Sequence, residues 1–239
     1  MRTFARLLIV VAVLTVPAAS LFAQAAADPS GHWEGSIQMQ PNMAIKVEID
    51  LAKNARGEFA GTFGQPDQRV KGLPLSTVAV ESRSVRFVVK GGAQPATFTG
   101  TLAANGQSIA GEAAQGGYSI PFTLTRTGDA KIAAAPKNAA IGKELEGTWQ
   151  GALDVNGAQM RLVVKMANQP DGTAAGTIVS PDGSNVEIPI GITQKAANVT
   201  IDVPSVGASF VGVLSGADLA GTWTQGPSSL PLTLHLSKP

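Results

Sequence analysis

Short runs of alternating apolar and polar residues fill most of the chain after Ser30. In the clearest run, residues 43–51, apolar side chains alternate with Lys46, Glu48 and Asp50. This period of two predicts a strand with one face on a core and the other in water. Gly, Asn, Asp and Pro separate successive runs, which is typical of strands joined by tight turns. We therefore predict an all-β protein.

The pattern occurs twice along the chain. Residues 31–35 read GHWEG and residues 147–151 read GTWQG. Later in each copy, residues 98–102 (FTGTL) match residues 210–214 (FVGVL). Self-similarity at a long spacing indicates a repeated structural unit, with insertions confined to loops. Glycines inside the matched runs are expected to be structural, because a missing side chain lets a curved sheet close.

Turn sequences divide the second copy into about eight strands, the regular spacing of an antiparallel sandwich or barrel. Hairpin after hairpin without a long crossover favours an up-and-down barrel, which has no sheet edges. We predict two tandem small antiparallel meander β-barrels, at residues 30–127 and 146–239. Between them, residues 128–145 are rich in Ala, Lys and Pro and are predicted to form a linker.

The first 25 residues have the features of a secretory signal peptide. Arg2 and Arg6 precede an apolar run at 7–16, and residues 23–25 (AQA) form a small-x-small cleavage site. We expect cleavage near Ala25 and a periplasmic or secreted protein. The apolar run is shorter than the ~20 residues of a membrane-spanning helix, so no membrane span is expected after cleavage.

Charge and cysteine content narrow the possible partners. The formal net charge is +1, and removal of the leader takes two arginines with it. A nearly neutral chain without a basic run is not expected to bind nucleic acid. The absence of cysteine excludes disulfides and thiol chemistry, so packing alone must stabilise the fold.

Small eight-stranded barrels are either filled by side chains or hold one small ligand. The many medium-sized inward residues lead us to expect packed interiors, with an open pocket as the alternative. Four residues are candidates for ligand contact or for plugging a barrel: Trp33, Arg126, Trp149 and Trp223.

The Gly-x-Trp openings at Trp33 and Trp149, together with Arg126 on the last strand of the first copy, resemble the signature of the calycin barrels, the lipocalins and avidins. Arg126 shares the inward parity of Leu124, as a cation stacking on Trp33 would require. The second copy departs from this signature, because Leu236 occupies the matching position. The resemblance implies a barrel that carries a small apolar ligand.

A second resemblance extends over the full length of each copy. Its motifs are Gly-x-Trp-x-Gly, Ser-Pro-Asp, Ile-Pro, Phe-x-Gly-x-Leu and Gly-Thr-Trp-x-Gln-Gly-x-x-x-Pro-Leu. They are similar to the β-rich accessory segment that precedes the catalytic domain in many secreted bacterial α/β-hydrolase-fold serine hydrolases. Here the segment is present as two tandem copies without the hydrolase. The resemblance implies an accessory role, or a degenerate partner of a secreted serine hydrolase.

No catalytic constellation is evident. The segments around Ser108 and Ser209 have one residue too many for a Gly-x-Ser-x-Gly elbow and run into strands. His32 and His235 have outward parity and are expected to be lone surface histidines, and Asp50 is expected on a solvated face. No calcium-loop or zinc spacing occurs, so we assign no metal and no cofactor.

These features together predict an exported, non-catalytic binding or accessory module. Its partner would be an unknown small apolar ligand or another protein. A lipocalin-like carrier of a small apolar ligand is the main alternative.

Overall fold

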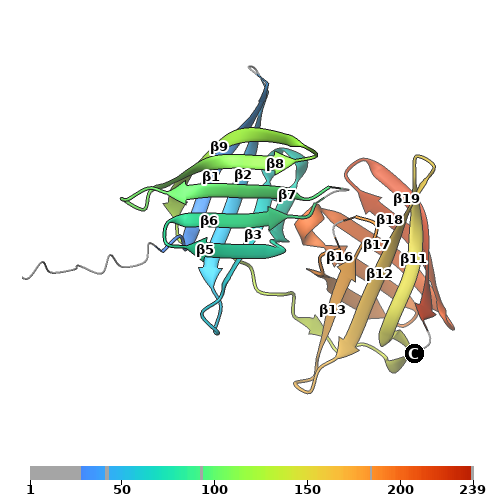
Figure 1. The fold of residues 1–239 in the computed structure, drawn as a ribbon. Coiled ribbons are helices and arrows are strands. Elements are labelled where there is room, and N and C mark those ends of the chain that lie inside the picture. Colours follow the sequence, from blue (N-terminus) through green and yellow to red (C-terminus); the bar gives the residue numbers. More distant parts are fainter. Residues whose placement is uncertain (1–27, 41–42, 92–93, 184, 238–239) are drawn as a thin grey trace, which may run out of the picture.

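A computed structural model describes residues 28–40, 43–91, 94–183 and 185–237. The predicted signal peptide lies outside these residues and stays a prediction. Within the described part of the chain, no helix is both long enough and apolar enough to cross a membrane. The strands form two curved sheets, one from each half of the chain (Figure 1).

The first sheet is a nine-stranded antiparallel meander with strand order β4-β3-β2-β1-β9-β8-β7-β6-β5. Every neighbouring pair is a sequential hairpin except β1 with β9, which joins the first and last strands. The short 3-10 turn η1 (Pro66–Gln68) lies between β3 and β4. The strands are β1 (Gly31–Gln40), β2 (Met43–Lys53), β3 (Phe59–Gln65), β4 (Val70–Pro74), β5 (Thr77–Glu81), β6 (Ser84–Val89), β7 (Ala96–Leu102), β8 (Ser108–Gln115) and β9 (Tyr118–Gly128).

The second sheet repeats this arrangement in a ten-stranded sheet, in which β11 pairs with β19 as β1 does with β9. Its strands are β10 (Asn138–Ala139), β11 (Gly147–Val155), β12 (Ala158–Asn168), β13 (Thr173–Val179), β14 (Ile188–Pro189), β15 (Gly191–Lys195), β16 (Asn198–Val203), β17 (Ala208–Ser215), β18 (Asp218–Gln225) and β19 (Ser228–Ser237). Two further 3-10 turns are η2 (Lys143–Leu145) and η3 (Pro204–Val206). The prediction of two tandem antiparallel barrel-like units in an all-β chain is confirmed.

The edges of each sheet are brought together by the chain itself. In the first unit, residues 75–76 pass from β4 to β5, and the Leu75 amide donates to the Gly61 carbonyl at 2.9 Å. The matching bond in the second unit joins Ile190 to Gly176 at 3.1 Å. There Asn138 adds a second bridge, because its Nδ2 donates to Ile190 and its Oδ1 accepts from the Ile192 amide. Gly61 of β3 and Gly176 of β13 thus accept hydrogen bonds from the residues that lead into the edge strands β5 and β15.

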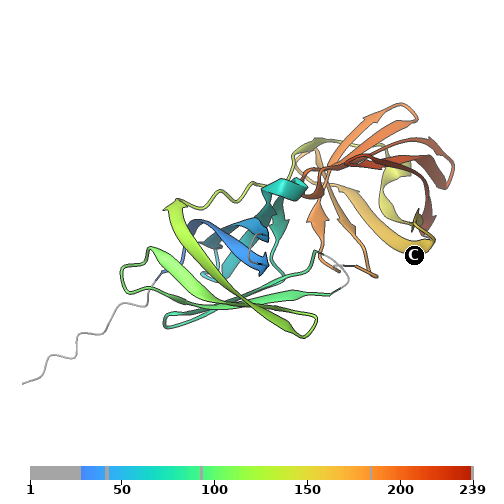
Figure 2. The same ribbon diagram turned by 90° about the horizontal axis from the view of Figure 1, so that it is seen from above.

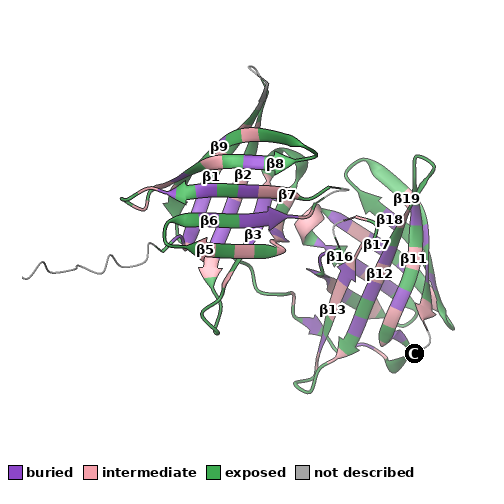
Figure 3. Cartoon of the chain, in the orientation of Figure 1, coloured by how far each residue is buried: buried purple, intermediate pink, exposed green. Residues whose placement is uncertain are grey.

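Buried and exposed positions alternate along the strands, as the period of two predicts (Figure 3). Trp33, Trp149 and Phe87 are fully buried. The repeated glycines inside the strands have the expected structural role: a Cβ on Gly35 would lie 2.1 Å from the Thr123 carbonyl oxygen, and a Cβ on Gly151 would lie 2.3 Å from that of Thr233. At these positions neighbouring strands approach too closely for any side chain.

The expectation that His32 and Asp50 lie on a solvated face was wrong. His32 is 4% exposed, its Nδ1 lies 2.8 Å from Asp50 Oδ1, and the Lys131 amide donates to the same oxygen at 2.6 Å. The chain that follows β9 therefore passes over the outer face of β1 and β2 and covers this pair. His235 is exposed as expected, but it is not alone, because its Nδ1 lies 2.7 Å from Asp218 Oδ1.

The second half of the predicted linker packs on the second barrel. It contains β10 and η2, and within it Ile141 and Leu145 are buried. Asn168 holds this segment with its side chain, which accepts from the Ile141 amide at 2.9 Å and donates to the Ile141 carbonyl at 2.8 Å. Residues 131–135 are exposed throughout.

Candidate functional site

One end of the first barrel is closed by Trp33 and Arg126. The Trp33 indole N–H donates to the Pro29 carbonyl at 2.9 Å, and the Arg126 guanidinium carbon lies 4.6 Å from the centroid of the indole. The guanidinium also donates to the main-chain carbonyls of Gly106, Asp28 and Ser30. These contacts fix the last strand of the barrel to the segment that precedes the first strand.

The second barrel has an apolar version of the same closure. The Trp149 indole N–H donates to the Leu145 carbonyl at 3.0 Å, four residues earlier as in the first barrel. Leu236 pairs with Trp149 in the register that Arg126 has with Trp33. A Cβ on Gly147 would lie 2.8 Å from Leu236 Cδ1, which explains why glycine opens this strand.

The structure therefore separates the four predicted site residues. Trp33, Arg126 and Trp149 lie at the closed ends and line neither mouth. Trp223 lies at the opposite end of the second barrel, where it lines a hollow. The four residues do not form one site.

The opposite end of the first barrel is open. A hollow of about 670 Å³ occupies this mouth, within the range of small-molecule sites in proteins. Some of its apolar walls are only partly buried, including Ile37, Ile45, Val70 and Ile120. The remaining apolar walls from the first barrel are Val47, Phe63, Leu73, Val89, Ala96, Phe98 and Ala113. The expectation of a packed interior thus holds at the Trp33 end and fails at the mouth.

The mouth of the second barrel contains a smaller hollow of about 360 Å³. Its apolar walls come from the corresponding strand ends: Met160, Leu162, Ile178, Val179, Ile188, Val203 and Trp223. Ser180 also lines it, and the Ser180 hydroxyl oxygen is buried without a hydrogen-bond partner among the described residues. A buried hydroxyl without a partner costs free energy that a ligand's polar group would recover.

The two mouths adjoin each other. Ile188 and Val206 of the second barrel line the hollow of the first barrel, and Gly91 of the first barrel lines both hollows. The turn η3 packs against β4, where the two barrels meet (Figure 2). The Ser205 hydroxyl donates to the Gly72 carbonyl at 3.3 Å. The second barrel thereby supplies part of the wall of the larger hollow.

Charges at the mouths are few and unequal. Lys90, which directly follows β6, is the one charged residue that lines the hollow of the first barrel in the described chain. In the second mouth, Asp182 accepts hydrogen bonds from the Arg161 Nε at 2.9 and 3.0 Å and from the Arg161 amide at 3.0 Å. These hydrogen bonds lower the pKa of Asp182 to about 2. The carboxylate of the second mouth is therefore already neutralised, whereas Lys90 has no ion-pair partner among the described residues.

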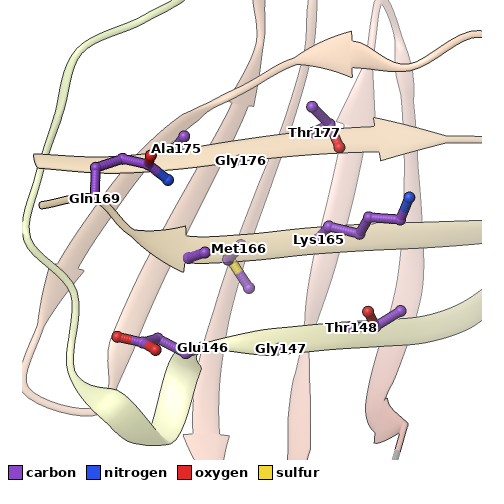
Figure 4. Close-up of a pocket in the computed structure, with 10 residues that line it drawn as sticks. Glu146, Gly147, Thr148, Lys165, Met166, Gln169, Ala175, Gly176 and Thr177 are labelled. Atoms are coloured by element: carbon purple, nitrogen blue, oxygen red, sulfur yellow. The ribbon is translucent and has the colours of Figure 1, made fainter. Parts of the chain in front are cut away.

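A further hollow, of about 500 Å³, lies on the outer surface of the second barrel across β11, β12 and β13 (Figure 4). Thr148 and Lys165 in this hollow occupy the positions that His32 and Asp50 have in the first barrel. Its charged groups are paired, because Lys165 Nζ lies 2.6 Å from Glu187 and Glu146 accepts from Asn168. We therefore place the candidate site at the mouths and not on this surface.

Ser108 and Ser209 lie in β8 and β17 and not on a turn between a strand and a helix. Nowhere among residues 28–40, 43–91, 94–183 and 185–237 do three or more His, Asp or Glu side chains gather in a way that could hold a metal ion.

The mouth itself was missed at the sequence level. Alternation assigned Ile45 to an inward face, but it does not show whether other side chains fill the space in front of it. In the structure, the mouth is marked by Tyr118, an aromatic residue at a hairpin end that lines the hollow and is 77% exposed.

Comparison with known proteins gives no family. No protein-family model and no curated protein matches the chain. Among solved structures, a candidate outer membrane protein from Bacteroides fragilis aligns at 14% identity, over 89% of this chain and 99% of that one, with a TM-score of 0.29. A protein of unknown function from the DUF3598 family of Nostoc punctiforme aligns at 14% identity, over 87% and 96%, with a TM-score of 0.25. At these TM-scores neither likeness supports an inference about function.

Proposed function

We propose that the protein is an exported, non-catalytic binding module that holds a small, mainly apolar molecule in the mouth of its first barrel. The observation that carries this proposal is the hollow of about 670 Å³, walled by apolar strand ends and completed by Ile188 and Val206 of the second barrel. The predicted signal peptide supports a place outside the cytoplasm for such a module.

The physical basis is the unfilled apolar surface of the mouth. Ile37, Ile45 and Val70 contact the core but remain partly exposed. Each square ångström of apolar surface that a ligand removes from water contributes about 25 cal/mol, so an apolar molecule is favoured there over water. The closed end gives this site a fixed floor, because Trp33 and Arg126 hold the ends of β1 and β9 together.

The polar groups of the mouth are suited to orienting a ligand and not to reacting with it. The first mouth presents side-chain amides, from Gln65, Gln68 and Gln115, and the hydroxyl of Ser119. The Ser119 hydroxyl already donates to the Glu112 carboxylate at 2.7 Å, and Glu112 itself does not line the hollow. A few polar groups in an apolar hollow are typical of a binding site.

Titration with N-phenyl-1-naphthylamine, a neutral probe that fluoresces in apolar surroundings, tests the proposal. We expect saturable binding to the mature protein, weakened at least about tenfold by Ala96→Trp, which fills the mouth. Ala79→Trp is the matched control, because Ala79 is exposed on β5 and lines neither mouth. Absence of saturable binding, or equal loss in both variants, would contradict the proposed function.

Native mass spectrometry of protein purified from the periplasm or medium supplies an independent readout. A reproducible extra mass that is lost on delipidation, and that is absent from Ala96→Trp, is the expected result.

A further inference from the structure

We infer that the molecule held in the first mouth is an amphiphile with an anionic head, and that Lys90 pairs with this head while the apolar tail enters the barrel. The inference rests on the proposed function and adds the chemical class of the ligand. It is carried by the position and isolation of one cation in an otherwise uncharged hollow.

Lys90 stands where the two mouths meet. It follows Val88 and Val89, which are buried in the first barrel, and is itself only partly exposed. The next residue, Gly91, lines both hollows, and a Cβ placed on it would lie 3.3 Å from the Leu73 side chain. Lys90 shares the parity of the exposed Arg86 and lines the hollow at its rim, directly after the end of β6.

The carboxylate of Glu112, which lies beside the hollow, already accepts from the Ser119 hydroxyl at 2.7 Å. The walls of the first hollow include no Asp or Glu in the described chain. The one acid of the adjoining mouth, Asp182, is held by Arg161 through both of its oxygens. A lysine on an apolar rim without a partner favours an incoming anion, because the anion meets a weakly screened positive charge.

The polar neighbours of the hollow fit an oxyanion head. Gln65 and Gln68 also line it, and their side-chain amides supply hydrogen-bond donors. The remaining walls are aliphatic or aromatic and suit a hydrocarbon tail. A carboxylate or a phosphate attached to a single acyl chain has this chemistry, and the head would be the same whether the ligand is a free acid or a single-chain lipid.

The experiment compares ligands that differ only in the charge of the head. Dodecanoate, 1-dodecanol and dodecyltrimethylammonium, each below its micelle concentration, compete with N-phenyl-1-naphthylamine at pH 7.5 and low salt. Lys90→Met removes the charge and retains the length, Lys90→Arg retains the charge, and Lys71→Met removes an exposed lysine of β4 that lines neither hollow.

The expected result is a head-group preference that depends on Lys90. Wild type and Lys71→Met should bind dodecanoate about fivefold more tightly than dodecanol, as one ion pair at a partly exposed site supplies. Lys90→Met should bind dodecanoate and dodecanol equally well, with its affinity for dodecanol unchanged. Lys90→Arg should keep the fivefold preference for dodecanoate. The trimethylammonium compound should bind wild type more weakly than dodecanol does. In Lys90→Met, this difference in affinity between the two compounds should be smaller.

Two different failures are distinguishable. Equal binding of dodecanoate and dodecanol in wild type, or an unchanged ratio in Lys90→Met, overturns the inference and leaves the proposed function standing. If none of the three compounds displaces the probe because no probe binds, the proposed function itself fails. The affinities for dodecyl phosphate and dodecanoate then show whether the site prefers a phosphate or a carboxylate head. A preference for either one supports an anionic ligand.

Discussion

Arg126 lies over the indole of Trp33, with its guanidinium carbon 4.6 Å from the ring centroid, and joins the last strand of the first barrel to the segment before its first strand. In the second barrel, Leu236 pairs with Trp149 in the same register, and its side chain lies beside Gly147. The two copies thus share a closed end and differ in its chemistry, which makes the contribution of the charge measurable.

We predict that Arg126→Leu destabilises the first barrel by about 2 to 4 kcal/mol, since the cation–π contact and the hydrogen bonds to three carbonyls are lost together. Urea unfolding followed by tryptophan fluorescence measures the change. Arg86→Leu, at an exposed position on β6, is the control and should change stability by less than about 0.5 kcal/mol. Equal effects of the two substitutions would show that the closure is not a stabilising contact.

The three tryptophans should differ in how much they contribute to the stability of the folded protein. Trp33→Phe and Trp149→Phe each remove an indole N–H that donates to a buried carbonyl, so we expect similar losses of about 1 to 2 kcal/mol. Trp223→Phe should cost less, because its indole makes no such bond within the described residues. Thermal unfolding of the three single variants tests the order, and a larger loss for Trp223→Phe than for the other two would refute it.

The covering segment after β9 should be held by Asp50. Asp50→Ala removes the acceptor of the Lys131 amide and the partner of His32, so trypsin should cut after Lys131 about fivefold faster or more. Asp202→Ala, an exposed aspartate on β16, is the control. In wild type, early cuts should fall after Lys131 and Lys137, in the exposed part of the linker. Early cleavage within β2 would show that the two barrels are wrongly delimited.

The pair of Arg161 and Asp182 should persist in acid. Hydrogen bonds from Arg161 lower the pKa of Asp182 from 3.8 to about 2. The pair therefore favours the folded state fully above pH 3.8, and its contribution is lost as the pH falls towards 2. NMR titration of the Asp182 carboxyl carbon should give a midpoint near 2, and Arg161→Gln should move it up towards 3.8. A wild-type midpoint near 3.8 would mean that the pair does not form in solution.

Much of the fold was accessible from the sequence because local alternation and turn chemistry agree with it. The inward parity of Val47, Ile49 and Leu51 and that of Arg126 followed from periods of two, whereas the stacking of Arg126 on Trp33 was implied by the calycin resemblance. The burial of His32 did not, because the chain that covers it lies nearly a hundred residues away and carries no pattern of its own. The mouth was missed for a related reason. Parity predicts on which face of the sheet a side chain lies. It does not predict how deep the strand end lies, or that the neighbouring barrel completes the wall.

The most direct test of the account is the position of a bound amphiphile. Crystals of the mature protein grown with 12-bromododecanoate, measured at the bromine absorption edge, should show one anomalous peak inside the first mouth, among Phe63, Phe98 and Ala113, with the carboxylate beside Lys90. A bromine peak only on the outer surface, or no peak at a ligand concentration that saturates probe displacement, would contradict the placement of the site.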